Sequence, residues 1–362
     1  MSIFSSFFQE KNPQSMLGID IGSNSIKITE LERSGGNFQV KNIGLVKTPE
    51  GSIVHYNIVK PDEVANAIRK TLESLNITQR KAVVGLPGPV CFTKRIKLSG
   101  ISPKEIARVI SSEAGNHVPY NLDSVCLDFQ LIGIDEKQNL DVLLVAVKKE
   151  IIDSYVSTLK KAQVEPVICD VDYFALGNIF EASYPEERLS TIALLDIGET
   201  HCAISILKNG APLLNVDVGV GSQVYKDDLC SNLKISPEGA EEVVLGKKTG
   251  NEQQKNISDS IEASTKKIAR ELSRKLSFFA STALTETSIE GIYLCGGGVL
   301  VDGLVNALKE ETGLACKCFD PARSMVLPSN FHSNQEKTKN IMPMFSISLG
   351  LATRRCGDKP NP

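Results

Sequence analysis

Two short segments, far apart in the chain, each place an aspartate and a glycine at the end of an apolar stretch. LGIDIGSNSIKI surrounds Asp20 and LLDIGETHCAIS surrounds Asp196, so the two aspartates lie 176 residues apart. In each segment the apolar stretch reads as a strand, and the chain turns back after a few polar residues. One such turn is ordinary glycine and aspartate turn chemistry. The same pattern twice, half a chain apart, predicts two matched hairpins that act together.

The turns of both hairpins offer groups that bind a phosphate. Glycine lets the backbone approach a ligand closely, and successive N–H groups in a turn bind anionic oxygens. The candidate residues are Gly22, Ser23, Asn24 and Ser25 in the first turn, and Gly198, Glu199 and Thr200 in the second. Lys27 is a candidate point charge for the phosphates. Because Asp20 and Asp196 would repel a phosphate directly, we expect them to act through Mg²⁺, with water between the metal and the carboxylates.

A third candidate segment, LCGGGVLVDGL at 294–304, is rich in glycine and follows an apolar strand. Gly296, Gly297 and Gly298 expose bare backbone against which a flat base or a ribose can lie, close to a helix expected from Val301 to Thr312. The segment is not GxGxxG, which argues against a dinucleotide site, and the chain contains no GxxxxGK[ST] phosphate loop.

The elements that position these turns follow from the apolar periodicity. In the first half the expected strands are LGIDIG, IKITELER, FQVKNIGLVKT and AVVGLPG, with a helix from Pro61 through Val64, Ile68, Leu72 and Leu75. VEPVICDVD is then expected to be a strand that leads into a helix containing Phe174. In the second half we expect the strands TIALLDIG, HCAISIL, APLLNVDVGVG and IYLCGGG, a helix over about 257 to 284, and a closing helix in FSISLGLATRR. This pattern predicts an α/β protein with an internal duplication.

Residues 89–148 are expected to form a small β-α-β-β unit. The strands are VCFTKRIKL, VCLDFQLIGI and LDVLLVAV. Ser102 and Glu105 form a capping box that opens the helix through Ile106, Val109 and Ile110.

Composition narrows the class of protein. The chain has 362 residues, 41% hydrophobic and 23% charged, with a net charge of -3. It lacks the basic excess that binding to nucleic acid requires, and it has no apolar run long enough to span a membrane and no secretory signal. The nine cysteines follow no zinc-binding spacing. An apolar cluster lies near the start of the sequence and consists of Ile3, Phe4, Phe7 and Phe8. We interpret this segment as a frayed terminus in preference to a membrane or partner anchor.

Taken in order, the two hairpins and the glycine segment resemble the phosphate and adenosine motifs of the actin/Hsp70/hexokinase ATPase superfamily. PVICDVDYFALGN and FSISLGLATR resemble its two connecting helices. Within the superfamily, the chain most resembles the PilM family of type IV pilus assembly and, through it, the cell-division protein FtsA. The resemblance covers residues 17 to about 354. It departs from the pattern in VDVGVGSQVYKDDL, which lacks paired glycines, so ligand contacts from that stretch are left open.

This resemblance implies an α/β, actin-like two-lobed ATPase fold made of duplicated ribonuclease-H-like domains, with an FtsA/PilM-type extra α+β subdomain in lobe one. The expected parts are a flexible leader at 1–15, a lobe-one core at 16–88 and 149–185, the inserted subdomain at 89–148, a lobe-two core at 186–225 and 285–354, a mostly helical lobe-two subdomain at 226–284, and a tail at 355–362.

The resemblance also implies a function. ATP with Mg²⁺ would lie between the lobes of a cytoplasmic scaffold in the pilus inner-membrane platform. The scaffold would dock the cytoplasmic N-terminal tail of a bitopic PilN-type protein and attach peripherally to the inner membrane through it. Other pilus assembly ATPases and platform proteins are further implied partners, as is self-association.

Two other functions stay open. A small-molecule (sugar or acid) kinase of the same fold needs a carboxylate base, for which Asp170 and Asp172 are candidates. An FtsA-like cell-division protein is the second alternative, although the turn-rich end TRRCGDKPNP is not expected to form a membrane helix.

Whether ATP is hydrolysed is also open. Asp170, Asp172 and Glu199 are the candidates to orient a water, and we expect turnover to be weak or absent.

Overall fold

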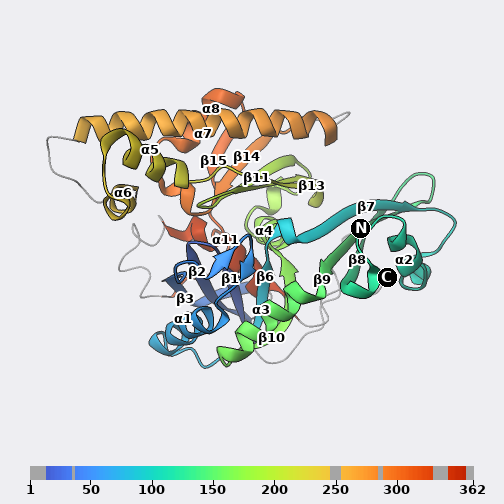
Figure 1. Cartoon of the computed structure of the whole chain (residues 1–362). Helices are drawn as coiled ribbons and strands as arrows, with labels where there is room; N and C mark the ends of the chain where they lie inside the picture. The colour runs from blue at the N-terminus through green and yellow to red at the C-terminus, as the bar shows by residue number, and fades with distance from the viewer. Residues whose placement is uncertain (1–13, 35–36, 245–253, 284–287, 329–340, 356–362) are drawn as a thin grey trace.

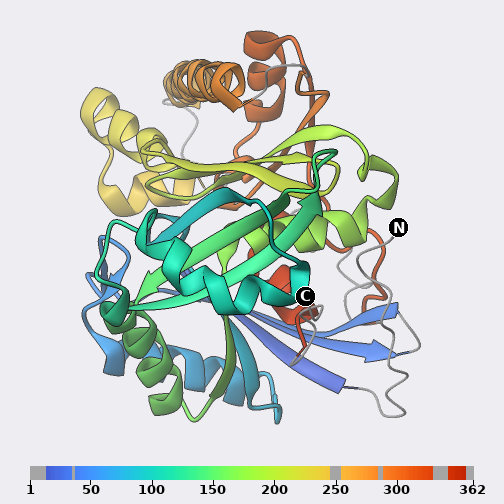
Figure 2. The same ribbon diagram turned by 90° about the vertical axis from the view of Figure 1, so that its right-hand side faces the viewer.

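The computed structural model describes residues 14–34, 37–244, 254–283, 288–328 and 341–355. The apolar leader cluster and most of the expected tail lie outside these residues. The chain forms two stacked lobes, with a smaller subdomain at their side (Figures 1 and 2). None of the helices in the described part of the chain combines the length and apolar character needed to cross a bilayer.

Lobe one is built on a five-stranded sheet of order β10-β6-β1-β2-β3. Its strands are β1 (Gln14–Ile21), β2 (Ser25–Ser34), β3 (Asn37–Lys47), β6 (Lys81–Leu86) and β10 (Glu165–Val171). Strands β1 to β3 are antiparallel, and β6 lies parallel to β1 and β10. Side chains alternate across β1. Leu17 and Ile19 pack toward α1 (Pro61–Ser74) and α3 (Lys149–Lys161), whereas Met16 packs toward α4 (Asp172–Ser183) and α11 (Ser346–Thr353).

Lobe two repeats this arrangement, with the order β13-β12-β11-β14-β15. Its strands are β11 (Thr191–Ile197), β12 (Cys202–Lys208), β13 (Ala211–Val218), β14 (Gly291–Cys295) and β15 (Ala315–Cys318). Again the first three strands are antiparallel, and the last two run parallel to β11. The helices α5 (Gln223–Leu233), α6 (Pro237–Val244), α7 (Gln254–Ala283) and α8 (Leu304–Thr312) complete the lobe. The predicted duplication and two-lobed fold are confirmed.

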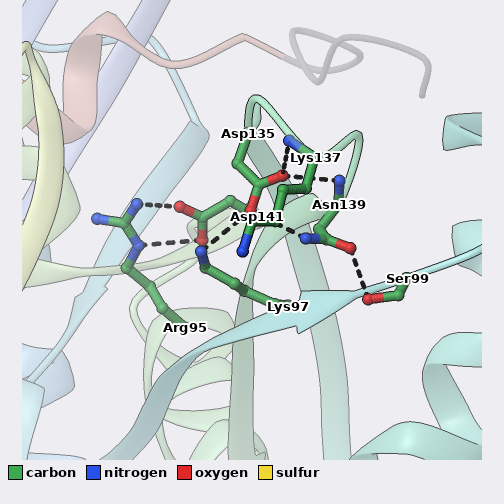
Figure 3. Close-up of polar contacts among 7 residues, drawn as sticks. All are labelled: Arg95, Lys97, Ser99, Asp135, Lys137, Asn139 and Asp141. Atoms are coloured by element: carbon green, nitrogen blue, oxygen red, sulfur yellow. Dashed lines mark hydrogen bonds and ion pairs between the residues drawn. The ribbon is translucent and has the colours of Figure 1, made fainter.

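The segment after β6 forms a three-stranded sheet of order β7-β9-β8. Its elements are β7 (Cys91–Leu98), α2 (Ile106–Gly115), β8 (Val125–Ile134) and β9 (Leu140–Lys148), which confirms the predicted β-α-β-β order and the capping box. Arg95 on β7 pairs with Asp141 on β9 (Figure 3), and its Nη1 lies 3.4 Å from the carbonyl oxygen of Pro212 on β13. This arginine therefore joins the subdomain to lobe two.

Two local predictions need correction, and one small element was not predicted. The expected helix from Val301 begins at Leu304, because Gly303 has φ +91°, a left-handed value outside a helix, and a short 3₁₀ turn spans Gly297–Leu300 instead. Strand β13 ends at Val218, before the glycines of GVG. The sequence analysis also missed a small hairpin of β4 (Ile53–Val54) and β5 (Asn57–Ile58), since two-residue strands leave no periodicity to detect.

Helix α11 lies against β1 and α4 at distances that only glycine permits. A Cβ on Gly18 would lie 1.9 Å from the carbonyl oxygen of Ser348, and one on Gly350 would lie 2.0 Å from that of Ala175. Both obstacles are backbone atoms, so a rotamer change cannot relieve the overlap. The C-terminal helix is thus fixed to lobe one by close backbone packing.

We expect Gly18→Ala or Gly350→Ala to lower the free energy of unfolding by about 3 kcal/mol or more, because the sheet and helix must separate. Gly133→Ala on β8 is the control, since its Cβ would meet no described atom within 4 Å. Urea unfolding monitored by circular dichroism measures the difference. Equal stability of Gly18→Ala and Gly133→Ala would contradict this packing.

Candidate functional site

The β1–β2 and β11–β12 hairpins bring their aspartates together between the lobes. Asp20 is paired in register with Lys27, and Lys27 Nζ lies 3.2 Å from Asp20 Oδ2. The matching partner of Asp196 is Ala203, so the two hairpins differ at this position. Lys27 also interacts electrostatically with Asp196 of the other lobe. One lysine therefore faces the aspartates of both hairpins.

The first hairpin turn leaves donors available to a ligand. Thr48, just after β3, donates its backbone N–H to Asn24 O at 2.9 Å and its Oγ1 hydroxyl to Gly22 O at 2.7 Å. Within the described chain, the backbone N–H groups of Ser23 and Asn24 have no hydrogen-bond partner. Thr48 thus fixes the carbonyl groups of Gly22 and Asn24, while the N–H groups of Ser23 and Asn24 have no partner among the described residues.

The second turn is held in the same way. Gly198 N donates to His201 O at 2.9 Å, and Gln223 N donates to Glu199 O at 2.7 Å. Over the described residues, no partner exists for the N–H groups of Glu199 and Thr200. The stretch after β13, whose ligand contacts the sequence left open, braces this turn through the start of α5.

The three consecutive glycines differ in their surroundings. A Cβ on Gly296 would lie 2.4 Å from Asp196 Oδ1, and one on Gly298 would lie 2.4 Å from the side chain of Ile197. These two glycines let the segment pack on the second hairpin. A Cβ on Gly297 would meet nothing closer than 3.8 Å. Gly297 therefore offers the bare, accessible backbone that the sequence analysis assigned to all three.

A groove of about 430 Å³ lies between α6, α7 and α8, a few residues beyond these glycines. Its polar lining includes Glu262 and Lys266 on α7, Asp302 just before α8, and Asn306 on α8. The sequence analysis missed this groove because its lining comes from separate helices whose polar residues look like ordinary solvent-exposed faces.

The site concentrates negative charge. Burial raises the pKa of Asp196 to about 6, although Lys27 acts in the opposite direction. Burial, followed by Asp20 and Asp196, raises the pKa of Asp172 well above its usual range. Burial lowers the pKa of Lys27, but Asp20 and Asp196 outweigh it and the net shift is upward. A further cation would be electrostatically favoured here. Over the described residues, no group of three or more His, Cys, Asp or Glu side chains is arranged to hold a metal ion directly.

The three sequence candidates for water activation occupy different surroundings. Asp170 accepts a hydrogen bond from Arg354 at 2.7 Å and another from its neighbour Val171 N. Glu199 forms a close ion pair with Lys226 on α5. Asp172 lies among the site carboxylates, and its buried Oδ1 has no hydrogen-bond partner in the described chain. Asp172 is therefore the candidate with an oxygen that no described group engages.

Sequence reasoning missed a contact between the lobes. Tyr173 on α4 donates a short hydrogen bond to Asp217 Oδ2 on β13. Burial raises the pKa of Asp217, and the Tyr173 bond opposes this shift. His201 Nε2 lies 3.9 Å from the other oxygen, Asp217 Oδ1. Asp217 is one polar residue in an ordinary strand, so no sequence signal separates it from a solvated position.

Comparisons with known proteins agree with this geometry. The family model described as "Type IV pilus assembly protein PilM" matches residues 18–356. A solved structure described as a PilM-PilN type IV pilus biogenesis complex matches with a TM-score of 0.80 and 26% identity, over 94% of this chain and 98% of that chain. The ethanolamine utilization protein EutJ from Carboxydothermus hydrogenoformans has a TM-score of 0.58 and 12% identity, over 94% and 90% of the two chains, which shows a shared fold alone.

Among curated sequences, the chain is similar to the cell division protein FtsA of Bacillus subtilis (strain 168). The two are 25% identical over 257 residues, which is 64% of this chain and 58% of FtsA. The chain thus spans little more than half the length of this relative.

We expect Tyr173→Phe to lower the free energy of unfolding by about 1–3 kcal/mol at neutral pH, because it leaves the buried Asp217 carboxylate without its donor. The pKa of Asp217 is already raised, and loss of the bond raises it further. Protonation then removes the unpaired charge, so the loss should shrink as pH falls from about 8 to about 5. Urea unfolding at several pH values measures this trend.

The control for this prediction is the double variant Tyr173→Phe with Asp217→Asn, which removes both the donor and the charge. It should be more stable than Tyr173→Phe alone. A loss of the same size at every pH would show that Tyr173 acts through packing instead of through Asp217.

Proposed function

The chain belongs to the PilM family of type IV pilus assembly proteins, and from this premise we propose that it is a nucleotide-binding scaffold of the pilus assembly platform. The nucleotide is ATP, with its phosphates between the two hairpins. The main support for this proposal is four backbone N–H groups, those of Ser23, Asn24, Glu199 and Thr200, that have no partner among the described residues. They belong to two turns whose aspartates interact electrostatically across the lobes.

Magnesium fits the residues of this site. Asp20 and Asp196 offer carboxylates from both lobes, and Asp172 adds a buried oxygen without a hydrogen-bond partner in the described chain. Mg²⁺ keeps several waters and binds proteins through one or two carboxylates together with substrate phosphates. Asp20 and Asp196 would hold it through water, and Lys27 would face the phosphates. When bound, the metal supplies positive charge to the phosphate oxygens.

The groove between α7 and α8 is the proposed place for the base and ribose. Gly297 lies between the second hairpin and Asp302 of this groove in the sequence, and its backbone is not crowded by a described side chain. Asp302 offers a carboxylate to which ribose hydroxyls can donate, and Asn306 offers an amide. The nucleotide would thus contact both lobes, so its binding favours the closed arrangement.

We propose binding, with weak or absent hydrolysis, as the role of the nucleotide. Asp170 and Glu199 are engaged in ion pairs, which leaves Asp172 as the candidate to orient a water. No specific observation favours the kinase alternative, and the family assignment favours pilus assembly over an FtsA-like role in division.

The proposed partner is the cytoplasmic N-terminal tail of a bitopic PilN-type protein, through which the chain would attach peripherally to the cytoplasmic face of the inner membrane. The solved PilM-PilN complex supports this partner, since the chain is similar to it over 94% of its length. We place the contact at the subdomain of residues 89–148.

Gly297→Val should weaken Mg-ATP binding at least about tenfold, because a branched side chain would fill the space proposed for the nucleotide. Its thermal stability should change little, since a Cβ at this position would meet no described atom closer than 3.8 Å. Isothermal titration calorimetry measures the affinity. In the matched control, Gly298→Val, the side chain would overlap Ile197, so its main effect should be on stability. Wild-type affinity in a folded Gly297→Val variant would remove this glycine from the site.

The partner contact has its own test. Replacing residues 89–148 by a short linker should abolish binding of a PilN-type tail peptide, whereas deleting residues 1–15 should preserve it. Mg-ATP titration checks that the nucleotide cleft still forms in the shortened chain. Peptide binding that depends on the first 15 residues would show that the leader, and not the subdomain, makes the connection.

A further inference from the structure

The β4–β5 hairpin of lobe one has an unusual turn. His55 has φ +47° and Tyr56 has φ +65°, so two consecutive residues with side chains occupy the left-handed region. Tight hairpin turns of this shape favour asparagine and glycine, and other residues adopt them at a cost. Such a backbone persists only where the surroundings hold it.

One buried and one exposed side chain hold this turn in place. Tyr155 on α3 is 1% exposed, and its hydroxyl donates to the carbonyl oxygen of Tyr56 at 3.0 Å. Asn57 Nδ2 donates to the carbonyl oxygen of His55 at 3.1 Å. The core of lobe one therefore fixes where the Tyr56 side chain points.

The Tyr56 ring lies against lobe two. It meets the ring of His201 edge to face, with 5.2 Å between the ring centroids and 79° between the planes. His201 also closes the second phosphate turn, because its carbonyl oxygen accepts from Gly198 N. His201 Nδ1 lies 3.2 Å from the hydroxyl of Thr200, whose N–H group is one of the open donors. The Tyr56 contact is thus one residue away from the proposed phosphate site.

The other edge of His201 faces Asp217, which Tyr173 of lobe one holds by a hydrogen bond. Two aromatic side chains of lobe one, Tyr56 and Tyr173, therefore constrain the same histidine of lobe two, one directly and one through a carboxylate. Any separation of the lobes would release His201 on both sides.

We propose that His201 is a positioning residue for the second phosphate turn, and that Tyr56 makes its position depend on the closed arrangement of the lobes. This inference rests on the proposed nucleotide site. It adds that the turn from Gly198 to His201 is presented to phosphates only while the lobe-one ring holds His201.

A double-mutant cycle in the full-length protein tests this coupling. Tyr56→Ala and His201→Ala should each weaken Mg-ATP binding about tenfold, and the double variant should bind no more weakly than either one alone. Tyr56→Phe keeps the ring and should bind as the wild type does. The matched control is His55→Asn, in the same turn, which alters an exposed side chain and keeps a residue that tolerates the left-handed region.

A phosphate-free ligand separates positioning of the turn from general damage to the fold. Adenosine, measured by competition against a fluorescent ATP analogue, should bind all these variants as it binds the wild type. Additive losses near a hundredfold in the double variant, or equal weakening of adenosine and ATP, would overturn the coupling while leaving the nucleotide site standing. A wild-type protein that binds neither ligand would refute the proposed function and this inference together.

Discussion

The central constraint on this molecule is the burial of several carboxylates around one lysine. Asp20 and Lys27 lie on the β1–β2 hairpin of lobe one, and Asp196 lies on the β11–β12 hairpin of lobe two. Lys27 interacts electrostatically with both aspartates. Buried like charges disfavour ionisation unless a cation compensates them. Burial, together with the neighbouring carboxylates, raises the pKa of both Asp172 and Asp196, although Lys27 acts in the opposite direction. The lobes are thus brought together around a site that is short of positive charge.

The rest of the fold holds the lobes at that site from several sides. The glycine packing of Gly18 and Gly350 fixes α11 against lobe one. Tyr173 and Tyr56 reach lobe two beside the second hairpin, and Lys47 pairs with Glu241 on α6 at 2.9 Å. Arg95 extends the contact from the inserted subdomain to β13. Because β13 holds both Pro212 and Asp217, movement of the subdomain and movement of the β11–β12 turn would affect the same strand.

Local pattern was enough to predict the hairpins, the duplication and the inserted unit, because each depends on strand and turn signals within a few residues. The site needed more than local pattern. Asp217 and His201 gain their roles only when α4 and the β4–β5 turn are packed against them. The three glycines looked equivalent in sequence, yet Gly296 and Gly298 serve packing and Gly297 remains open. Asp170 and Asp172 also looked alike in sequence. They differ in the structure because Asp170 pairs with Arg354, which lies 184 residues away in the chain.

The magnesium dependence of ATP affinity tests most directly whether this cluster of buried charged groups is a nucleotide site. Isothermal titration calorimetry of ATP, in the presence of Mg²⁺ and in EDTA, would compare the wild type with Asp196→Asn. Asparagine keeps the shape of the side chain and removes the charge. The wild type should bind ATP at least about tenfold more tightly with Mg²⁺, and Asp196→Asn should lose most of that difference. A variant that keeps the full magnesium effect would contradict the account.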